Sequence, residues 1–215
     1  MYSVKEAFYS LQGEGARAGR ASVFCRFSGC NLWSGRERDR ATSVCRFCDT
    51  DFVGTDGQNG GKFAMAGELA SHLASLWPMS TSEATTPYVV FTGGEPLLQL
   101  DSSLIAAMHD RGFEIAVETN GTLKPPAGID WLCVSPKGRA PLSLTQGNEI
   151  KLVYPQPDAM PERFRDLAFE HFFLQPMDLD FQGVEGNTLT QTVDYCLAHP
   201  QWRLSIQLHK LAGID

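Results

Sequence analysis

The segment CNLWSGRERDRATSVCRFCDTD (residues 30–51) holds three cysteines at unequal spacing. Fourteen residues separate Cys30 from Cys45, whereas two separate Cys45 from Cys48. Within the long gap, GRERDRA alternates in charge at helical spacing, which predicts a solvated helical turn or a surface that a partner recognises. A closed structural zinc site needs four ligands, so three cysteines raise the question of a fourth.

Cys25 is the nearest candidate for a fourth ligand, but its surroundings argue against that role. The alternating segment ASVFCRF (residues 21–27) predicts a strand on which Cys25 and Arg26 face opposite sides, with Cys25 directed toward helix packing. His72 and His109 fall in predicted helices without metal-ligand spacing to the cysteines. Three cysteines alone favour a 4Fe-4S cluster with one open iron, and a zinc protein is the alternative.

The composition sets the broad class of the protein. A chain of 215 residues with 43% hydrophobic residues predicts a single domain over residues 1–215. It has no apolar run of signal-peptide or membrane-span length, so we expect a cytoplasmic protein with no membrane contact and with thiols or metal ligands rather than disulfides. The net charge of -7 argues against direct nucleic-acid binding.

Short apolar segments alternate with helical patterns along the rest of the chain. Strands are predicted at ASVFCRF, YVVF, FEIAVET, WLCVSP, EIKLVYP and HFFLQP, and helices at ELASHLASLW, DSSLIAAMHD and near residues 161–168 and 189–199. This alternation predicts a parallel sheet in an open α/β sheet or a barrel. Most of the strands end in polar or glycine-containing tails, which predicts a site at the carboxyl ends of the strands.

Two motifs resemble the radical S-adenosylmethionine superfamily. CRFCD (residues 45–49) is similar to the end of its cluster motif, and TGGEP (residues 92–96) is similar to its glycine-rich segment. The resemblance implies a 4Fe-4S cluster whose open iron binds the methionine part of S-adenosylmethionine, while glycines let the backbone approach that group closely. Electron transfer from the cluster then generates a 5'-deoxyadenosyl radical.

Longer blocks resemble one family within that superfamily, the 7-carboxy-7-deazaguanine synthases. The blocks are FYSLQGEGARAGRASVFCRFSGCNL, CDTDF, FTGGEP, ETNG, VSPK, FFLQPMD and HPQWRLSIQLHK. The resemblance implies an incomplete TIM-like barrel of about six parallel strands with outer helices. It further implies a carbon-nitrogen lyase of queuosine and 7-deazapurine biosynthesis, which converts 6-carboxy-5,6,7,8-tetrahydropterin to 7-carboxy-7-deazaguanine with loss of ammonia. Magnesium, a flavodoxin-like reductant and a homodimer are also implied. The alternative is another radical enzyme, either glycyl-radical activating or RNA-modifying.

The resemblance also assigns roles to individual residues. It names no catalytic side chain, because the cofactor carries the radical chemistry. Cys30, Cys45 and Cys48 are expected to hold the cluster, and Thr50 to bind magnesium. The residues expected at S-adenosylmethionine are Phe47, Cys48, Asp49, Gly94, Ser135, Pro136, Lys137, Gln175, Pro176, Met177 and Asp178. Those expected at the pterin are Leu11, Gln12, Gly13, Arg26, Thr92 and Asp215, with Glu14, Gly93, Glu118 and His209 as further candidates.

Some of these roles have independent chemical reasons. A guanidinium suits bidentate capture of the pterin carboxylate, although Arg26 could instead pair with Glu14 or Asp49. Magnesium commonly takes only one or two protein oxygens, so a single threonine ligand is sufficient. Glu118 is expected either to accept hydrogen bonds from substrate or ribose or to cap the next helix.

Two segments carry open questions. His209 either returns over the site with the C-terminal segment or belongs to a frayed tail. The cluster loop (residues 30–48) contains an expanded insertion (residues 31–44), which is expected to lie outside the site and to offer a docking surface to the reductant.

Overall fold

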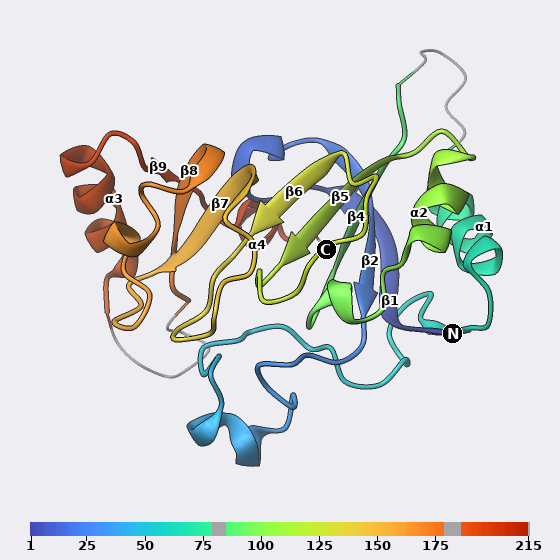
Figure 1. Cartoon of the computed structure of the whole chain (residues 1–215), viewed down its shortest axis with the longest axis horizontal. Coiled ribbons are helices and arrows are strands. Elements are labelled where there is room, and N and C mark those ends of the chain that lie inside the picture. The colour runs from blue at the N-terminus through green and yellow to red at the C-terminus, as the bar shows by residue number, and fades with distance from the viewer. Residues whose placement is uncertain (79–84, 179–185, 215) are drawn as a thin grey trace.

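The computed structural model describes residues 1–78, 85–178 and 186–214, and its strands form one mixed sheet (Figure 1). The strand order within this part of the chain is β3-β1-β2-β4-β5-β6-β7-β8-β9. The strands are β1 (Tyr2–Leu11), β2 (Ala21–Phe27), β3 (Gly61–Phe63), β4 (Tyr88–Gly93), β5 (Glu114–Thr119), β6 (Trp131–Val134), β7 (Gln146–Tyr154), β8 (Ala168–Pro176) and β9 (Arg203–Leu204). All neighbours from β2 to β9 are parallel, whereas β1 is antiparallel to β2 and β3. The sheet is open, as expected for an incomplete barrel.

All six predicted strands are confirmed, as β2 and β4 to β8. Three of the four predicted helices are also confirmed, as α1 (Ala66–Leu76), α2 (Ser102–His109) and α3 (Thr188–Ala198). The helix near residues 161–168 is wrong, since η4 (Pro161–Arg163) is only a short 3-10 turn. Ala168 pairs with Gln146 at the start of β7, so the chain is already extended there. The remaining helices are η1 (Gly15–Arg17), η2 (Glu37–Thr42), η3 (Pro96–Leu98) and α4 (Leu208–Ala212).

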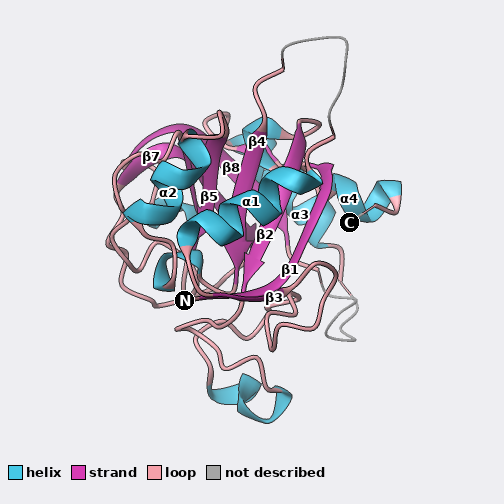
Figure 2. Ribbon diagram, turned by 90° about the vertical axis from the view of Figure 1, so that its right-hand side faces the viewer, coloured by secondary structure: helices cyan, strands magenta, loops and turns pink. Residues whose placement is uncertain are grey.

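Helices cover the outer face of the sheet. α1 and α2 lie together over β1, β2 and β5 (Figure 2), and α3 packs on β8 and β9. Val23, Cys25 and Phe27 point from β2 into the core beneath α1 and α2, where all three are fully buried. The predicted direction of Cys25 is therefore confirmed, and this thiol is buried in helix packing.

The inner face of the sheet is covered by the segment at residues 12–20. β1 ends at Leu11, which is paired with the start of β2, and the chain then crosses toward β9. The amide of Gly15 donates to Ser205 Oγ at 3.0 Å, next to β9. The guanidinium of Arg17 lies 4.0 Å from the ring centroid of Trp131 in β6. The segment thus closes the inner side of the open barrel and leaves space toward the carboxyl ends of the strands.

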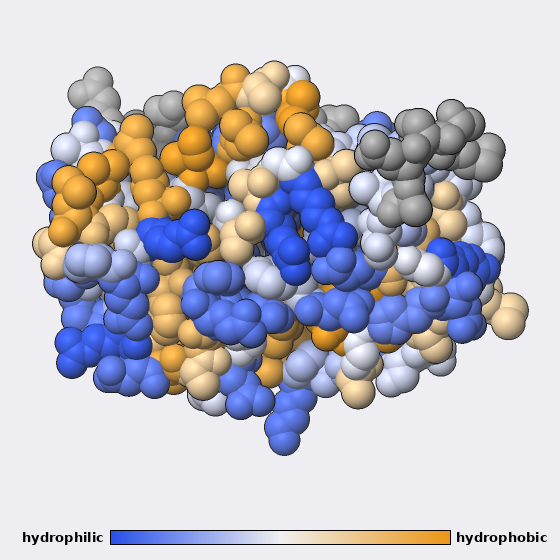
Figure 3. All heavy atoms as spheres, turned by 90° about the horizontal axis from the view of Figure 1, so that it is seen from above, coloured by the Kyte–Doolittle hydropathy of each residue, from blue (hydrophilic) through white to orange (hydrophobic). Residues whose placement is uncertain are grey.

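Two surfaces lie at opposite ends of the sheet. The loop that carries η2 extends beyond the carboxyl ends of the parallel strands (Figure 1), and η2 confirms the helical turn predicted from GRERDRA. The opposite side shows groups of hydrophobic side chains among polar ones (Figure 3). Among the described residues no helix has the length and apolar character needed to span a membrane.

Candidate active site

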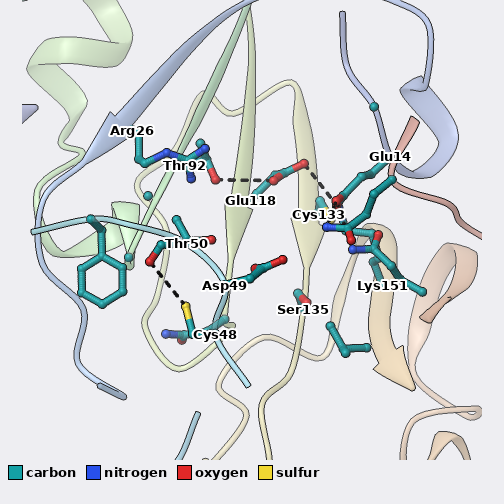
Figure 4. A pocket seen from close by; sticks show the side chains of 18 of the residues that line it. Glu14, Arg26, Cys48, Asp49, Thr50, Thr92, Glu118, Cys133, Ser135 and Lys151 are labelled. Carbon is teal, nitrogen blue, oxygen red and sulfur yellow. Dashed lines mark hydrogen bonds and ion pairs between the residues drawn. The ribbon is translucent and has the colours of Figure 1, made fainter. Parts of the chain in front are cut away.

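A cavity of about 460 Å³ lies between the inner face of the sheet and the cluster loop. It brings together nearly all of the predicted site residues, from segments far apart in the sequence. Pro136 and Met177 lie beside lining residues rather than at the cavity wall, and Asp215 is outside the described residues. Figure 4 shows Arg26 and Thr92 on one side, Glu14 and Lys151 on the other, and Glu118 between them. The sequence therefore predicted the composition of one real cavity, while the role of each residue stays a prediction.

The three cysteines of the cluster loop all line this cavity. Cys30 follows β2, and Cys45 and Cys48 lie on the turn after η2. The hydrogen bond from the Cys45 thiol lowers the pKa of Cys48 to about 6, whereas the same bond and burial raise the pKa of Cys45. The backbone amide of Leu32 donates to Cys30 Sγ at 3.4 Å. One member of the cysteine pair is thus disposed to ionise, as a thiolate ligand must.

The donor set holds the three cysteines expected for a 4Fe-4S cluster with one open iron. Within the described ranges, no three His, Cys, Asp or Glu side chains are grouped closely enough to hold one metal ion. A zinc ion needs its ligands around one point, whereas a cluster carries each cysteine on a different iron. Three thiols that line one cavity are the ligands that such a cluster would need.

The two glycines of TGGEP bring the end of β4 against the residues before Cys30. A Cβ on Gly94 would lie 2.2 Å from the carbonyl oxygen of Gly29 and 2.8 Å from Cβ of Cys30. Gly93 has φ +134°, and a Cβ there would lie 2.3 Å from the carbonyl oxygen of Phe27. The glycines thus permit close packing of two loops, besides leaving a wall of the cavity without side chains.

Glu95 of the same motif ties these loops to β5. It is fully buried, and its carboxylate accepts hydrogen bonds from Thr119 Oγ1 at 2.7 Å and from the amide of Asn120 at 2.8 Å. Burial raises the pKa of Glu95, although these hydrogen bonds oppose the rise. The sequence analysis missed this role, which joins the carboxyl ends of neighbouring strands.

A buried lysine that the sequence analysis missed is at the centre of a charged network. Lys151 Nζ lies 2.5 Å from Glu14 Oε2 and 3.4 Å from Glu118 Oε1. Burial acts to raise the pKa of Glu14, but the charge and hydrogen bond of Lys151 outweigh it and lower that pKa to about 2. Burial disfavours charge on Lys151 itself, yet Glu118 and Glu14 raise its pKa well above the usual value. Lys151 and Glu14 therefore form a charged pair inside the cavity, with the Glu118 carboxylate beside the ammonium.

Polar side chains fix the orientation of the two carboxylates. Gln12 Nε2 donates to Glu118 at 3.1 Å, and Gln175 Nε2 donates to Glu14 at 3.0 Å. Thr92 Oγ1 lies 3.4 Å from the second oxygen of Glu118. Glu118 accepts hydrogen bonds inside the cavity, so the alternative that it caps the next helix is wrong.

Arg26 pairs with a residue that the sequence analysis did not name. Its Nε donates to Glu6 Oε1 at 2.8 Å, because Glu6 is opposite Arg26 in the β1–β2 ladder. The expected alternatives, Glu14 and Asp49, are therefore wrong as its partners. The side chain nevertheless points toward the cavity (Figure 4), which leaves carboxylate capture as a prediction.

The C-terminal segment returns to the cavity, and the frayed-tail alternative is wrong. The amide of Leu208 donates to the carbonyl oxygen of Gly13 at 3.0 Å, and His209 in α4 lines the cavity. A Cβ on Gly13 would lie 2.4 Å from His209 Nδ1, so only glycine permits this approach. Lys210 then forms ion pairs with Asp49 at 2.8 Å and Asp178 at 2.5 Å.

The predicted cofactor-binding segments reach the cavity from distant parts of the chain. Cys48, Asp49 and Thr50 lie together there (Figure 4), and Lys137 Nζ donates to the carbonyl oxygen of Ser135 at 3.0 Å. The full set of predicted residues that line the cavity is Leu11, Gln12, Gly13, Glu14, Arg26, Cys30, Cys45, Phe47, Cys48, Asp49, Thr50, Thr92, Gly93, Gly94, Glu118, Ser135, Lys137, Gln175, Pro176, Asp178 and His209.

The expectation that the insertion lies outside the site is wrong. Leu32 and Trp33, which belong to residues 31–44, line the cavity. Other lining residues that the sequence analysis missed include Glu6, Asn120, Cys133, Lys151, Gln207 and Lys210. A lysine inside the apolar strand EIKLVYP was a usable signal for Lys151, because buried parallel strands rarely carry an unpaired charge.

Comparisons with known proteins agree with the motifs and the geometry. No family model matches the chain. A Bordetella pertussis protein named 7-carboxy-7-deazaguanine synthase is 65% identical over 213 residues, which cover 99% of each chain. A Caulobacter vibrioides protein of the same name is 63% identical over 214 residues, again 99% of each chain. The crystal structure of QueE from Escherichia coli superposes with a TM-score of 0.70 at 26% identity, covering 97% of this chain and 94% of that one. The chain belongs to the 7-carboxy-7-deazaguanine synthase family.

Proposed function

We propose that this protein converts 6-carboxy-5,6,7,8-tetrahydropterin to 7-carboxy-7-deazaguanine with loss of ammonia, as a radical S-adenosylmethionine lyase of queuosine and 7-deazapurine biosynthesis. The observation that carries the proposal is one cavity lined both by Cys30, Cys45 and Cys48 and by the charged pair Glu14 and Glu118. A redox group and a polar substrate can therefore meet there. Family membership at 65% identity supports the same reaction.

In this proposal, the three cysteines hold a 4Fe-4S cluster at one end of the cavity. Together with S-adenosylmethionine, a cluster bound there supplies the one-electron chemistry that generates a carbon radical. Gly94, in the cavity wall beside Cys30, contacts the methionine part, and the loops around Ser135 and Gln175 bind the remainder of that cofactor. The ordered side chains around the cavity hold both ligands in register and exclude water from the radical.

The pterin is bound by charged and polar groups from the inner face of the sheet. Glu14 and Glu118, which both lie beside Lys151, accept hydrogen bonds from the N–H groups of the pterin ring. The Arg26 guanidinium attracts the substrate carboxylate, and the Thr50 hydroxyl binds magnesium together with substrate oxygens. His209 in α4 lies against Gly13 and also contacts the pterin in this proposal.

Partners and location are also proposals. Arg36, Arg38 and Arg46 are exposed on the cluster loop, which supports docking of an acidic, flavodoxin-like reductant there. Exposed hydrophobic side chains such as Tyr9 and Ile206 support a homodimer, which sedimentation analysis tests directly. All six cysteines are unpaired, which is consistent with a reducing cytoplasm.

The proposed reaction has a direct test. The protein is reconstituted anaerobically with iron and sulfide, then incubated with the carboxytetrahydropterin, S-adenosylmethionine, magnesium and a reductant. We expect formation of the deazaguanine product, detected by mass spectrometry, and none from the Cys48→Ala variant. A reconstituted wild-type protein that binds zinc but lacks iron-sulfur absorbance would contradict the proposal. A loaded protein that cleaves S-adenosylmethionine without making this product would instead indicate another radical enzyme.

A further inference from the structure

An arginine of the cluster-loop insertion is held more tightly than its surroundings suggest. Arg40 lies in η2, a turn without buried residues, yet its side chain is only 14% exposed. Its guanidinium lies 4.1 Å from the ring centroid of Trp33, and its Nε donates to Glu37 Oε2 at 2.8 Å. Trp33 in turn meets Phe52 edge-on, with 5.6 Å between ring centroids, and Phe52 is 1% exposed. The Arg40 guanidinium thus packs on Trp33, which in turn packs on the buried Phe52.

The same guanidinium binds the turn that carries two of the proposed cluster ligands. Nη1 of Arg40 donates to the carbonyl oxygen of Arg46 at 2.9 Å and to that of Cys48 at 3.0 Å. These carbonyls belong to the short turn between Cys45 and Cys48. One side chain therefore holds the backbone of the turn that directs both thiols, and it brings a positive charge to that turn.

We propose that Arg40 is a positioning residue for the cluster, which holds the Cys45–Cys48 turn in its ligating conformation and favours the reduced cluster by its charge. The inference rests on the proposed function, because it requires a cluster at these cysteines. Net charge and hydrogen bonding around a cluster help to set its reduction potential. The added electron is more favourable near a fixed cation, and a site screened little by water preserves that effect.

Neighbouring residues of the insertion provide matched comparisons. Glu37, which pairs with Arg40, is 77% exposed, so it offsets the arginine charge only in part. Arg38 is 73% exposed, and its Nε lies 3.6 Å from Asp39. A lysine at position 40 would keep the charge, but it lacks the planar group that stacks on Trp33 while donating to two carbonyls.

The test is a redox titration of the reconstituted protein, without S-adenosylmethionine, in which electron paramagnetic resonance measures the fraction of reduced cluster. For Arg40→Met we expect the ratio of reduced to oxidised cluster at a fixed potential to fall about tenfold, which corresponds to a potential about 59 mV more negative. Glu37→Gln should raise the ratio, and Arg38→Met, with the same loss of charge, should leave it near the wild-type value.

Several outcomes would overturn the inference. The first is an Arg40→Met protein with full iron content and the wild-type ratio. The second is equal shifts in Arg38→Met and Arg40→Met, which would show a general charge effect. If Arg40→Met binds no cluster, Glu37→Gln decides, because it keeps the contacts of Arg40 with the turn: the inference requires a raised ratio in that variant. A wild-type protein that binds no cluster would overturn the proposed function as well, so the two failures are distinguishable.

Discussion

Replacement of Lys151 by methionine should reverse the contribution of Glu14 to the pH dependence of stability. In the wild-type protein Lys151 lowers the pKa of Glu14 from 4.5 to about 2. A carboxyl group whose pKa is lower in the folded than in the unfolded state stabilises the fold above its unfolded pKa. That contribution is lost as the pH falls from about 4.5 to about 2.

The size of the change in stability follows from the lowered pKa of Glu14. The lowered pKa of Glu14 corresponds to about 3 kcal/mol of stability at neutral pH, at about 1.4 kcal/mol per pKa unit. Without Lys151 the carboxylate keeps its hydrogen bonds from Gln175 and Gln207 but remains buried with no cation in contact, so its pKa should rise and its ionised form should destabilise the fold. Removal of one partner from a buried ion pair typically costs about 3–5 kcal/mol, which agrees with this value.

Urea unfolding of the metal-free protein measures the difference in unfolding free energy between the wild type and Lys151→Met. The pH range, about 4 to 8, is set by the pKa of glutamate in the unfolded chain. We expect Lys151→Met to lose about 3 kcal/mol or more near neutral pH, and the loss to shrink as the pH falls toward 4. Glu14→Gln in the same background should restore part of the stability, and Lys124→Met, at an exposed position, should change it little. A loss that is independent of pH would refute the assigned charge coupling.

Three further predictions concern the cluster turn and α4. Cys48→Ala should abolish cluster binding, whereas Cys196→Ala on α3 should retain it. Iron analysis and absorption spectra measure the cluster content of both variants. Full iron content in Cys48→Ala would remove Cys48 from the ligand set. Thr50→Ala should weaken the magnesium dependence of product formation severalfold and leave cofactor cleavage intact, so an unchanged magnesium titration would exclude this hydroxyl as a ligand. Lys210→Met removes the two ion pairs of α4. It should speed hydrogen exchange of the amides in residues 208–212 about fivefold, since exposed ion pairs contribute up to about 1 kcal/mol each. Unaltered exchange would mean that backbone contacts alone hold α4.

Six of the parallel strands, β2 and β4 to β8, were predictable because their apolar or alternating patterns are local. β1 was not, since its charged Lys5 and Glu6 interrupt the pattern. In the folded chain Lys5 pairs with Asp51 at 2.9 Å and Asp56 at 2.8 Å, and Glu6 pairs with Arg26. Such distant partners cannot be read from a local window. β9, at two residues, is a strand only because β8 is beside it.

The candidate site was likewise predictable only where its residues lie close together in the sequence. Cysteines and glycines in short motifs identified one part of the cavity lining, because the residues of each motif are close in sequence. Lys151 and Gln207 were missed, since their contacts with Glu14 arise only when strands and termini are assembled. The role of Arg40 was hidden by its charged neighbours, because a surface pattern does not show that one guanidinium turns inward to bind the backbone.

Residues 12–15 and 205–210, which are far apart in the sequence, meet at the cavity, and this has a consequence for the synthesis of the protein. Gln207 Nε2 donates to Glu14 at 3.1 Å across 193 positions, and Gly15 contacts Ser205 across 190. Contacts of such long sequence separation form late in folding. The proposed cluster ligands, all before residue 49, therefore leave the ribosome well before the segment that completes the cavity wall. A cluster inserted during translation would face solvent and oxygen, so we expect cells to deliver it only after residues 205–210 have been made and folded.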